Sequence, residues 1–229
     1  KTVKTGDHLE EAIKDADWIV EVIIEDLGLK QKLFTDVDKY RKKGSIVSSN
    51  TSTIPLKAMA DGRSADFKKN FVITHFFNPP RHMRLLELIS GPDTDPVVTE
   101  TMKEFCDAKL GKNVVECNDT PGFLANRIGA YFLFRAITES IDSNISIEDV
   151  DTVMGRPLGL PKDGIYGLLD LVGIGLVPHI TESLSGTLSK DDGFMKIYRD
   201  TKMIDAMLEN GHWGRNAPNG GFYRMLKDD

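Results

Sequence analysis

The chain has 229 residues and a formal net charge of −6, with 29 basic and 35 acidic side chains. Hydrophobic residues make up 40% and charged residues 28%, so the composition provides for a core and excludes general disorder. The acidic balance argues against a nucleic-acid partner or an anionic membrane surface, and no apolar run approaches the ~20 residues of a membrane span.

The first 118 residues predict strands that alternate with helices. The predicted strands span residues 17–24, 45–49, 70–77, 85–89 and 113–116. The predicted helices span residues 7–16, 27–43, 55–60 and 94–110. This alternation is typical of an α/β layer with a largely parallel sheet.

The pattern becomes helical after residues 119–122. A long and strongly apolar helix follows Pro121, and Ser146 with Asp149 predicts the capped start of the next helix. We expect an α/β domain over 1–118 and an all-helical domain over 119–229. The apolar helix is expected to be the central buried helix of the helical domain, and part of it can also contact a second subunit. The two roles are compatible, and the sequence does not separate them.

Several chemically capable side chains are expected where strands end. They are Glu25, Ser52, His75 with Asn78, and Glu87. The carboxyl edge of such a sheet is where open α/β folds bind ligands. A histidine held by a carboxylate is a standard general base, and the spacing of His75 and Glu87 suits neighbouring strands joined by a short turn. A structural histidine with an unrelated glutamate is the alternative, and the residues alone leave the two about even.

Other patterns carry less information. Asn126 lies near the start of the long helix, where its amide could reach a ligand carbonyl or hydroxyl, although a surface asparagine is an equal explanation. The five histidines show no metal-ligand spacing and the two cysteines, Cys106 and Cys117, have no near partner, so we expect no metal site. Cysteines of this kind are typical of reduced thiols, which favours a cytoplasmic location. The chain contains no G-x-G-x-x-G.

Three segments together resemble the 3-hydroxyacyl-CoA dehydrogenase family. They are SNTST at 49–53, HFFNPP with LLELI over 75–89, and DTPGFLANR at 119–127, in the family's order and spacing. Residues 20–34 resemble the family's segment after its fourth strand, and residues 157–176 with the closing GGFYRM resemble its helical domain. The resemblance covers nearly the whole chain.

The resemblance implies a partial Rossmann-like domain over 1–118, followed by a helical substrate and dimerisation domain. It implies NAD-dependent oxidation of (S)-3-hydroxyacyl-CoA to 3-oxoacyl-CoA in fatty-acid β-oxidation, by a homodimer formed through the helical domain. His75 would be the general base and Glu87 its orienting partner, while Ser52 and Asn126 would hold the reacting oxygen and the thioester region. The implied NAD-site residues are Glu25, Lys30, Ser52, Asn78 and Arg215.

The chain also departs from the family pattern. Thr53 stands where the family commonly has a second serine, and the loop between Ser52 and His75 is longer by two residues. The family's first strand and glycine-rich turn are expected ahead of Lys1, so we expect exposed apolar sheet edge, poor NAD binding and no activity from this chain by itself. The longer-loop style resembles bacterial multifunctional β-oxidation proteins.

Two other functions stay open on the sequence. A reductase of a small β-hydroxyacid would share the architecture, but such enzymes typically use a lysine on the long helix, and this helix offers only Arg127 and Arg135 after Asn126. A non-catalytic binding or assembly module derived from the family is the second alternative.

Overall fold

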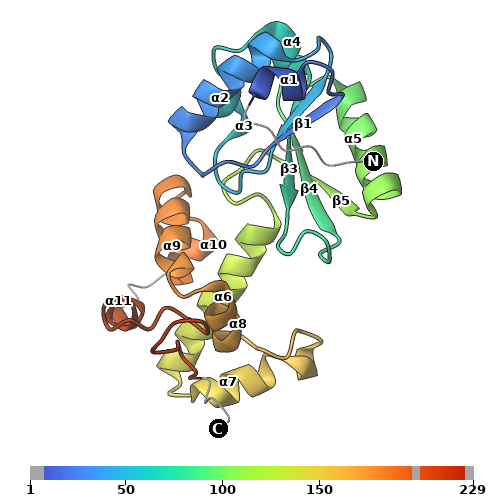
Figure 1. Cartoon of the computed structure of the whole chain (residues 1–229). Coiled ribbons are helices and arrows are strands. Elements are labelled where there is room, and N and C mark those ends of the chain that lie inside the picture. The colour runs from blue at the N-terminus through green and yellow to red at the C-terminus, as the bar shows by residue number, and fades with distance from the viewer. Residues whose placement is uncertain (1–7, 198–201, 225–229) are drawn as a thin grey trace. The chain divides into compact units, whose positions relative to one another are not determined.

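The computed structural model describes residues 8–197 and 202–224 (Figure 1). The chain divides into two compact units, residues 1–124 and residues 125–229. This division comes later than the expected boundary after Asn118, because the segment 119–124 packs with the first unit. Asp119 Oδ1 accepts a hydrogen bond of 3.1 Å from the Leu56 amide, and Phe123 is buried in that unit's core.

The first unit is built on a five-stranded sheet with strand order β1-β2-β3-β4-β5. The pairs β1–β2, β2–β3 and β4–β5 are parallel, and β3–β4 is antiparallel. The expected largely parallel sheet is therefore confirmed, with one reversal at its centre. The strands are β1 (Trp18–Glu21), β2 (Ile46–Ser49), β3 (Phe71–Phe76), β4 (Leu85–Ser90) and β5 (Asn113–Cys117).

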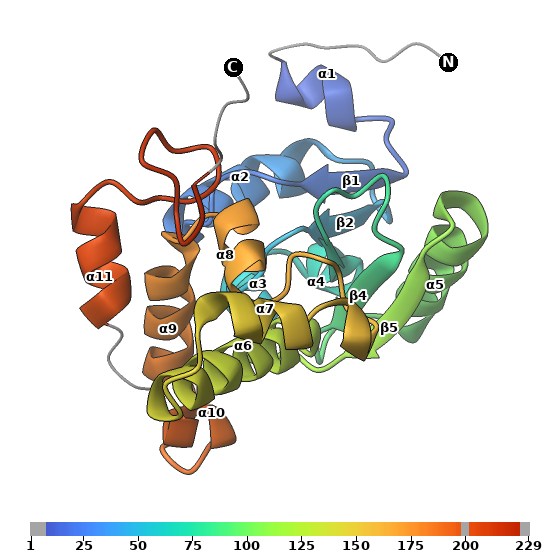
Figure 2. The same cartoon turned by 90° about the horizontal axis from the view of Figure 1, so that it is seen from below.

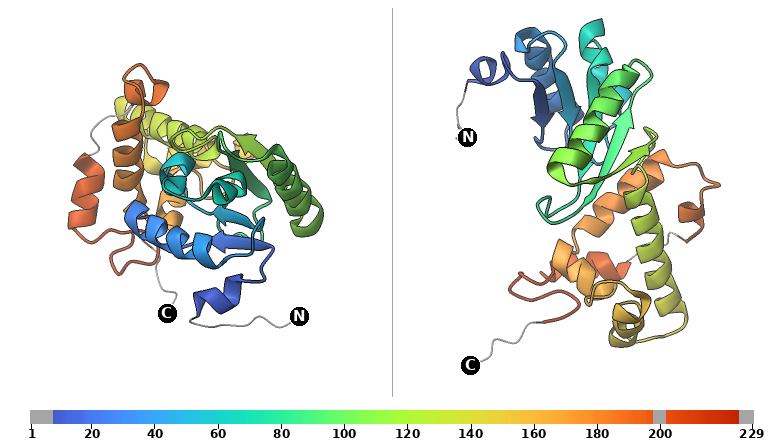
Figure 3. Two further views of the ribbon diagram at one scale, coloured as in Figure 1. Left: turned by 90° about the horizontal axis from the view of Figure 1, so that it is seen from above. Right: turned by 90° about the vertical axis from the view of Figure 1, so that its right-hand side faces the viewer.

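Helices cover both faces of this sheet (Figure 3). On one face the rings of Phe34, Phe67 and Phe71 meet with centroids 5.0–5.6 Å apart, joining α2 and α4 to β3. On the other face Met102 and Cys106 of α5 pack with Leu86 and Leu88 of β4. The helices are α1 (Leu9–Ile13), α2 (Leu27–Tyr40), α3 (Leu56–Ala60), α4 (Ala65–Lys69) and α5 (Pro96–Leu110).

The first strand is shorter than predicted and ends at Glu21 instead of residue 24. The Glu21 carboxylate accepts a hydrogen bond of 2.6 Å from the backbone amide of Ile23, which turns the chain out of the sheet. Beyond this turn the side chains of Val22 and Ile24 are 69% and 71% exposed. The apolar run therefore marks an exposed stretch beside the edge strand, not a longer buried strand.

In the described residues of the second unit, helices joined by loops are the regular secondary structure, and the segment after α11 is irregular (Figure 2). Its core forms around Phe134, Tyr166, Leu169 and Phe194. Among the described residues no single helix is long and apolar enough to cross a membrane; only α8 and α9 taken together, bent by 97°, reach that length and composition. The elements are α6 (Ala125–Asp142), α7 (Ile147–Val153), η1 (Arg156–Leu158), α8 (Tyr166–Val172), α9 (Leu176–Thr187), α10 (Gly193–Ile197) and α11 (Lys202–Glu209).

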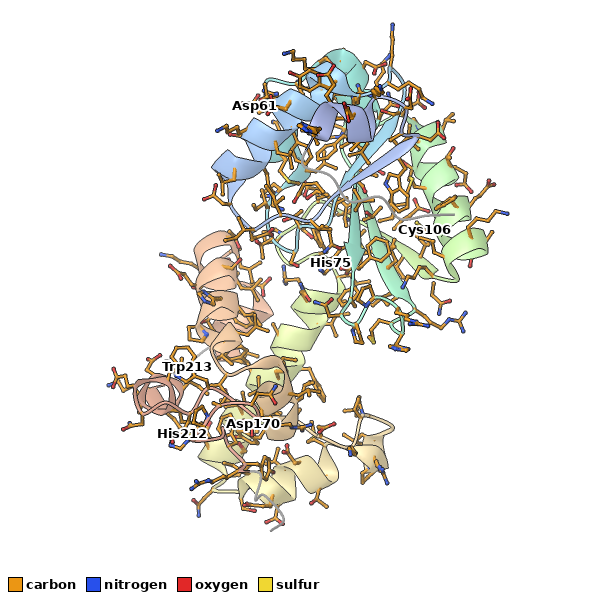
Figure 4. The ribbon with its side chains drawn as sticks, in the orientation of Figure 1. Asp61, His75, Cys106, Asp170, His212 and Trp213 are labelled. Carbon is orange, nitrogen blue, oxygen red and sulfur yellow. The ribbon has the colours of Figure 1, made fainter. Side chains whose placement is uncertain are left out.

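Two carboxylates fasten the last described segment of the helical unit. Asp170 of α8, labelled in Figure 4, is buried and accepts hydrogen bonds of 2.8 Å from the amides of Phe222 and Tyr223. Asp151 of α7 accepts 2.7–2.8 Å bonds from the amides of residues 165–167 and one of 2.9 Å from the Tyr223 hydroxyl. Residues 222–223 are thus held by side chains and form no strand.

Candidate active site

A histidine and a glutamate face each other across the antiparallel strands β3 and β4. His75 is in register with Glu87, and its Nδ1 lies 2.7 Å from Glu87 Oε2. Both side chains are buried, and His75 lies at the end of β3 in Figure 4. Because the carboxylate accepts from Nδ1–H, the other ring nitrogen, Nε2, carries the lone pair of the neutral imidazole. That nitrogen lies 3.0 Å from Ser52 Oγ.

Glu87 reaches this edge in a different way from the one the sequence suggests. We expected it at the end of its strand, but it is near the start of β4. Because β4 runs antiparallel to β3, its first residues lie beside the carboxyl end of β3. The reversal at the centre of the sheet is therefore what brings His75 and Glu87 together.

The segment after β5 encloses the pair. The Phe123 ring lies 5.6 Å from the His75 ring, which also contacts Phe77 at 4.5 Å. The Leu124 amide donates a 3.0 Å hydrogen bond to Glu87 Oε1, and Cys117 Sγ lies 3.8 Å from the same oxygen. Burial, together with the Glu87 charge, raises the pKa of the Cys117 thiol to about 11, so the thiol is protonated at neutral pH.

The turn that carries Ser52 is organised by Glu25. Glu25 Oε1 accepts hydrogen bonds of 3.0 and 3.1 Å from the amides of Ser52 and Thr53, and it also accepts the Thr51 hydroxyl. Burial of Glu25 disfavours its charge, but these bonds and the Lys30 ammonium outweigh burial and lower the pKa of the carboxyl below its ordinary value. Glu25 thus fixes the position from which Ser52 meets His75.

Lys30 is more deeply placed than a ligand-lining residue on the surface would be. Its side chain is 1% exposed, and its ammonium donates bonds of 2.8 and 2.9 Å to the two oxygens of Glu21. Glu25 Oε2 lies 3.3 Å from the same ammonium. Lys30 therefore joins the end of β1 to the Ser52 turn through two carboxylates.

The remaining predicted residues lie apart from this cluster or in the other unit. Asn78 is exposed and follows the end of β3. Asn126 is the second residue of α6 and half-buried, while Arg215 pairs with Asp163 at 2.6 Å; both belong to the helical unit. The roles of these three residues at an NAD or substrate site stay predictions.

Sequence reasoning did not identify five contributors to the site. Glu21 could have been found as a lone charge inside an apolar strand. Three of the others lie within the segments that resemble the family, but their contacts, made through a backbone amide or a ring, are not visible in the sequence, and neither is the weak thiol donor. These other contributors are Asn50, whose Oδ1 accepts the Phe76 amide at 2.9 Å, and Cys117, Phe123 and Leu124.

The edge of the sheet suits a polar ligand with hydroxyl groups. The Glu25 side chain is 38% exposed beside Ser52, so its carboxylate remains open to a further donor such as a ribose hydroxyl. Within the described parts of the chain there is no group of three or more histidine, cysteine or acidic side chains that could hold a metal ion. The Glu25 carboxylate is thus an acceptor that a hydroxyl of a polar ligand can reach.

Comparison with known protein families shows to which family this chain belongs. Residues 1–120 match the model described as 3-hydroxyacyl-CoA dehydrogenase, NAD binding domain, and residues 122–225 match the model described as 3-hydroxyacyl-CoA dehydrogenase, C-terminal domain. The chain belongs to the 3-hydroxyacyl-CoA dehydrogenase family. The family resemblance expected from the sequence is confirmed, and with it NAD as the family's cofactor.

Individual relatives agree with this assignment. The chain is 44% identical over 215 residues to a probable 3-hydroxyacyl-CoA dehydrogenase of Bacillus subtilis, covering 93% of this chain and 27% of that protein. It is 41% identical over 224 residues to a putative fatty acid oxidation complex trifunctional enzyme of Rickettsia prowazekii, covering 98% of this chain and 31% of that protein. The crystal structure of the (S)-3-hydroxybutyryl-CoA dehydrogenase of Ralstonia eutropha matches with a TM-score of 0.81 at 28% identity, covering 95% of this chain and 74% of that one.

Proposed function

We propose that this chain carries the acid–base centre of an NAD-dependent dehydrogenase that oxidises (S)-3-hydroxyacyl-CoA to 3-oxoacyl-CoA in fatty-acid β-oxidation. The observation that carries the proposal is the buried His75, whose Nδ1 is 2.7 Å from Glu87 and whose Nε2 faces Ser52 at 3.0 Å. A histidine oriented in this way by a carboxylate has the arrangement of a general base. Family membership supplies the reaction class.

NAD supplies the acceptor for the hydride that leaves C3 of the substrate. His75 Nε2 takes the proton of the 3-hydroxyl as the C3–H bond breaks, so that the oxygen becomes a carbonyl. Glu87 stabilises the imidazolium that results and keeps its Nδ1 proton in place. In the reverse direction the same imidazolium returns the proton to the carbonyl oxygen.

The neighbouring residues have positioning roles in this proposal. The Ser52 hydroxyl, already directed at Nε2, holds the reacting oxygen, and Asn126 binds the thioester region. Glu25, with Lys30 behind it, lines the NAD site together with Asn78 and Arg215. These assignments rest on the resemblance of the surrounding segments to the family, and Arg215 stands where the family often has a lysine.

We propose that this polypeptide by itself binds NAD poorly and is inactive, because its 229 residues include no G-x-G-x-x-G turn to receive the pyrophosphate. The test is oxidation of NADH driven by acetoacetyl-CoA, on this chain and on a version extended upstream through a glycine-rich strand. Activity in the extended form alone supports both proposals. Inactivity in both forms contradicts the dehydrogenase and favours a reductase of another substrate or a non-catalytic module.

We also propose a homodimer formed through the helical unit. A mainly apolar cavity of about 780 Å³ lies between α6, α7 and the start of α10, and its lining includes Ile128, Tyr131 and Val153, which are 43–62% exposed. A second copy placed against these side chains would remove them from water, which is the main driving force for association.

We also propose a cytoplasmic location for the chain, because both of its cysteines are free thiols, which are typical of a reducing compartment.

A further inference from the structure

The carboxylate that orients His75 is itself held at its second oxygen. While Glu87 Oε2 accepts from His75, Glu87 Oε1 receives the Leu124 amide at 3.0 Å and lies 3.8 Å from Cys117 Sγ. The Glu87 side chain is fully buried, so no solvent competes for these positions. Each oxygen of the carboxylate therefore has a separate partner set.

Holding both oxygens matters because a carboxylate turns about its terminal bond. The terminal torsion of glutamate is broad, and one hydrogen bond to His75 leaves that rotation open. Donors at the opposite oxygen fix the plane of the group and so fix the direction of the His75 bond. Hydrogen bonds to a charged group are also the stronger ones in a buried site.

The local backbone geometry directs both the Leu124 amide and the Cys117 thiol toward Glu87 Oε1. Phe123 has φ = 47°, in the left-handed region that non-glycine residues rarely occupy, and its ring contacts His75 while the next amide faces Glu87. Cys117 ends β5 beside Ile89 of β4, on the face of the sheet that His75 and Glu87 share. The thiol has a second acceptor, Val115 O, at 3.5 Å. Of the two, the charged carboxylate is the stronger acceptor.

We propose that Cys117 is a positioning residue of the dehydrogenase: together with the Leu124 amide its thiol clamps Glu87 and thereby holds His75 in its reactive orientation. This inference deepens the proposed function and rests on His75 being its general base. Cys117 does not touch the reacting atoms and acts only through Glu87.

The test uses the two cysteines as a matched pair. Cys117→Ala removes the thiol beside Glu87, and Cys106→Ala makes the identical change on α5, where the thiol is buried away from the pair (Figure 4). Cys117→Ser keeps a donor at the site. Circular dichroism and thermal melting of all three variants confirm that each remains folded.

The decisive readout is independent of turnover. In the ¹⁵N-histidine-labelled chain the His75 Nδ1 proton, identified by its loss in His75→Gln, should be protected from exchange with water by its bond to Glu87. We expect exchange about 3- to 10-fold faster in Cys117→Ala, because a donor to a buried charged group is lost, with Cys117→Ser close to wild type and Cys106→Ala unchanged. Equal exchange in Cys117→Ala and Cys106→Ala would overturn the proposal.

A kinetic measurement applies the same variants to the version of the chain that is extended upstream through a glycine-rich strand. There Cys117→Ala should lower kcat about 3- to 10-fold and change KM less than about 2-fold, since the thiol acts on the base and not on substrate binding. If kcat of Cys117→Ala equals that of Cys106→Ala, the positioning role fails while the dehydrogenase stands. If no form oxidises NADH, the proposed function fails, and the exchange experiment still decides whether Cys117 orders the pair.

Discussion

The proposed chemistry of this chain depends on a few side chains that are each held by more than one neighbour. His75 is held at both ring nitrogens, Glu87 at both oxygens, and Glu25 accepts four donors of the Ser52 turn through one oxygen. Such groups lose little freedom when substrate binds, because they are already ordered. Changes at His75 and Glu87 should therefore affect catalysis more than binding.

Glu87→Gln is the most direct test of the base at the residue scale. The amide keeps the shape of the side chain but removes the charge that stabilises the imidazolium, so we expect kcat to fall about 10²- to 10⁴-fold in the extended form. Steady-state kinetics with acetoacetyl-CoA and NADH measures this. Glu116→Gln, an identical change at an exposed position of β5, is the control. A kcat within twofold of wild type in Glu87→Gln would exclude the assigned role.

Glu25 should make the stability of the first unit depend on pH. The pKa of Glu25 is lowered in the folded chain, so its contribution is complete above its ordinary value of 4.5 and is lost as pH falls through the lower folded value. We expect Glu25→Gln to destabilise the chain at pH 7 and the difference from wild type to shrink below about pH 4.5. Urea denaturation between pH 7 and pH 3 measures this, with the exposed Glu104→Gln as control. A difference that does not depend on pH would contradict it.

At the scale of elements, the candidate site is formed by the one antiparallel strand pair, β3 and β4. The parallel strands β1 and β2 bring Glu21 and Ser49 to the same edge, and β4 returns Glu87 beside β3. The second unit instead uses side chains in place of strands, since Asp151 and Asp170 hold its last described segment. In both units buried carboxylates connect segments that are far apart in the sequence.

Asp170→Ala should destabilise the helical unit by about 2–4 kcal/mol. The change leaves the amides of the half-buried Phe222 and Tyr223 without their charged acceptor. The chain has one tryptophan in each unit, so fluorescence of Trp213 in a Trp18→Phe background reports unfolding of the helical unit in urea. Asp191→Ala, at an exposed position, is the control. A loss below about 0.5 kcal/mol would show that the two bonds are dispensable.

The sequence predicted the five strands because their signals are local, whereas the grouping of Ser52, His75 and Glu87 into one site came from the family resemblance. Strands and helix starts are predicted from residues adjacent in sequence, such as apolar runs and polar turns. The helix start at Ser146 is an example, because its Oγ accepts the Asp149 amide at 3.1 Å. The short helix α4 and the early end of β1 were missed. Both depend on side chains that cap backbone amides, Ser64 on Phe67 and Glu21 on Ile23. The direction of β4 was not readable, because periodicity is the same in parallel and antiparallel strands.

At the scale of the whole molecule, the helical unit leaves apolar side chains on its surface. Ile128 of α6 is 62% exposed and Val153 of α7 is 58% exposed, and both line the same cavity. Single exposed apolar residues are ordinary, but a group around one hollow is typical of an interaction surface. This is the surface that we assign to the second copy.

Ile128→Glu should therefore convert a dimer into a monomer. A charge buried at the centre of an apolar interface costs several kcal/mol when it has no partner. Sedimentation velocity should show wild type at twice the chain mass of 25.5 kDa and the variant at that mass. Leu110→Glu, at an exposed apolar position of the first unit, should leave the mass unchanged. A wild-type chain that sediments as a monomer at micromolar concentration would refute the dimer.

The hairpin of β3 and β4 has a consequence for the order in which the chain folds. His75 and Glu87 come from strands joined by a connection of only a few residues, whereas β1–β2 and β2–β3 require crossovers with helices. Closing the shorter loop costs less entropy, so this pairing forms without waiting for the parallel neighbours. In pulse-labelled hydrogen exchange we expect the β3–β4 amides to be protected before those of β1. The His75–Glu87 pair would then be among the first tertiary contacts of a nascent chain, and the β1–β2 pairing among the last.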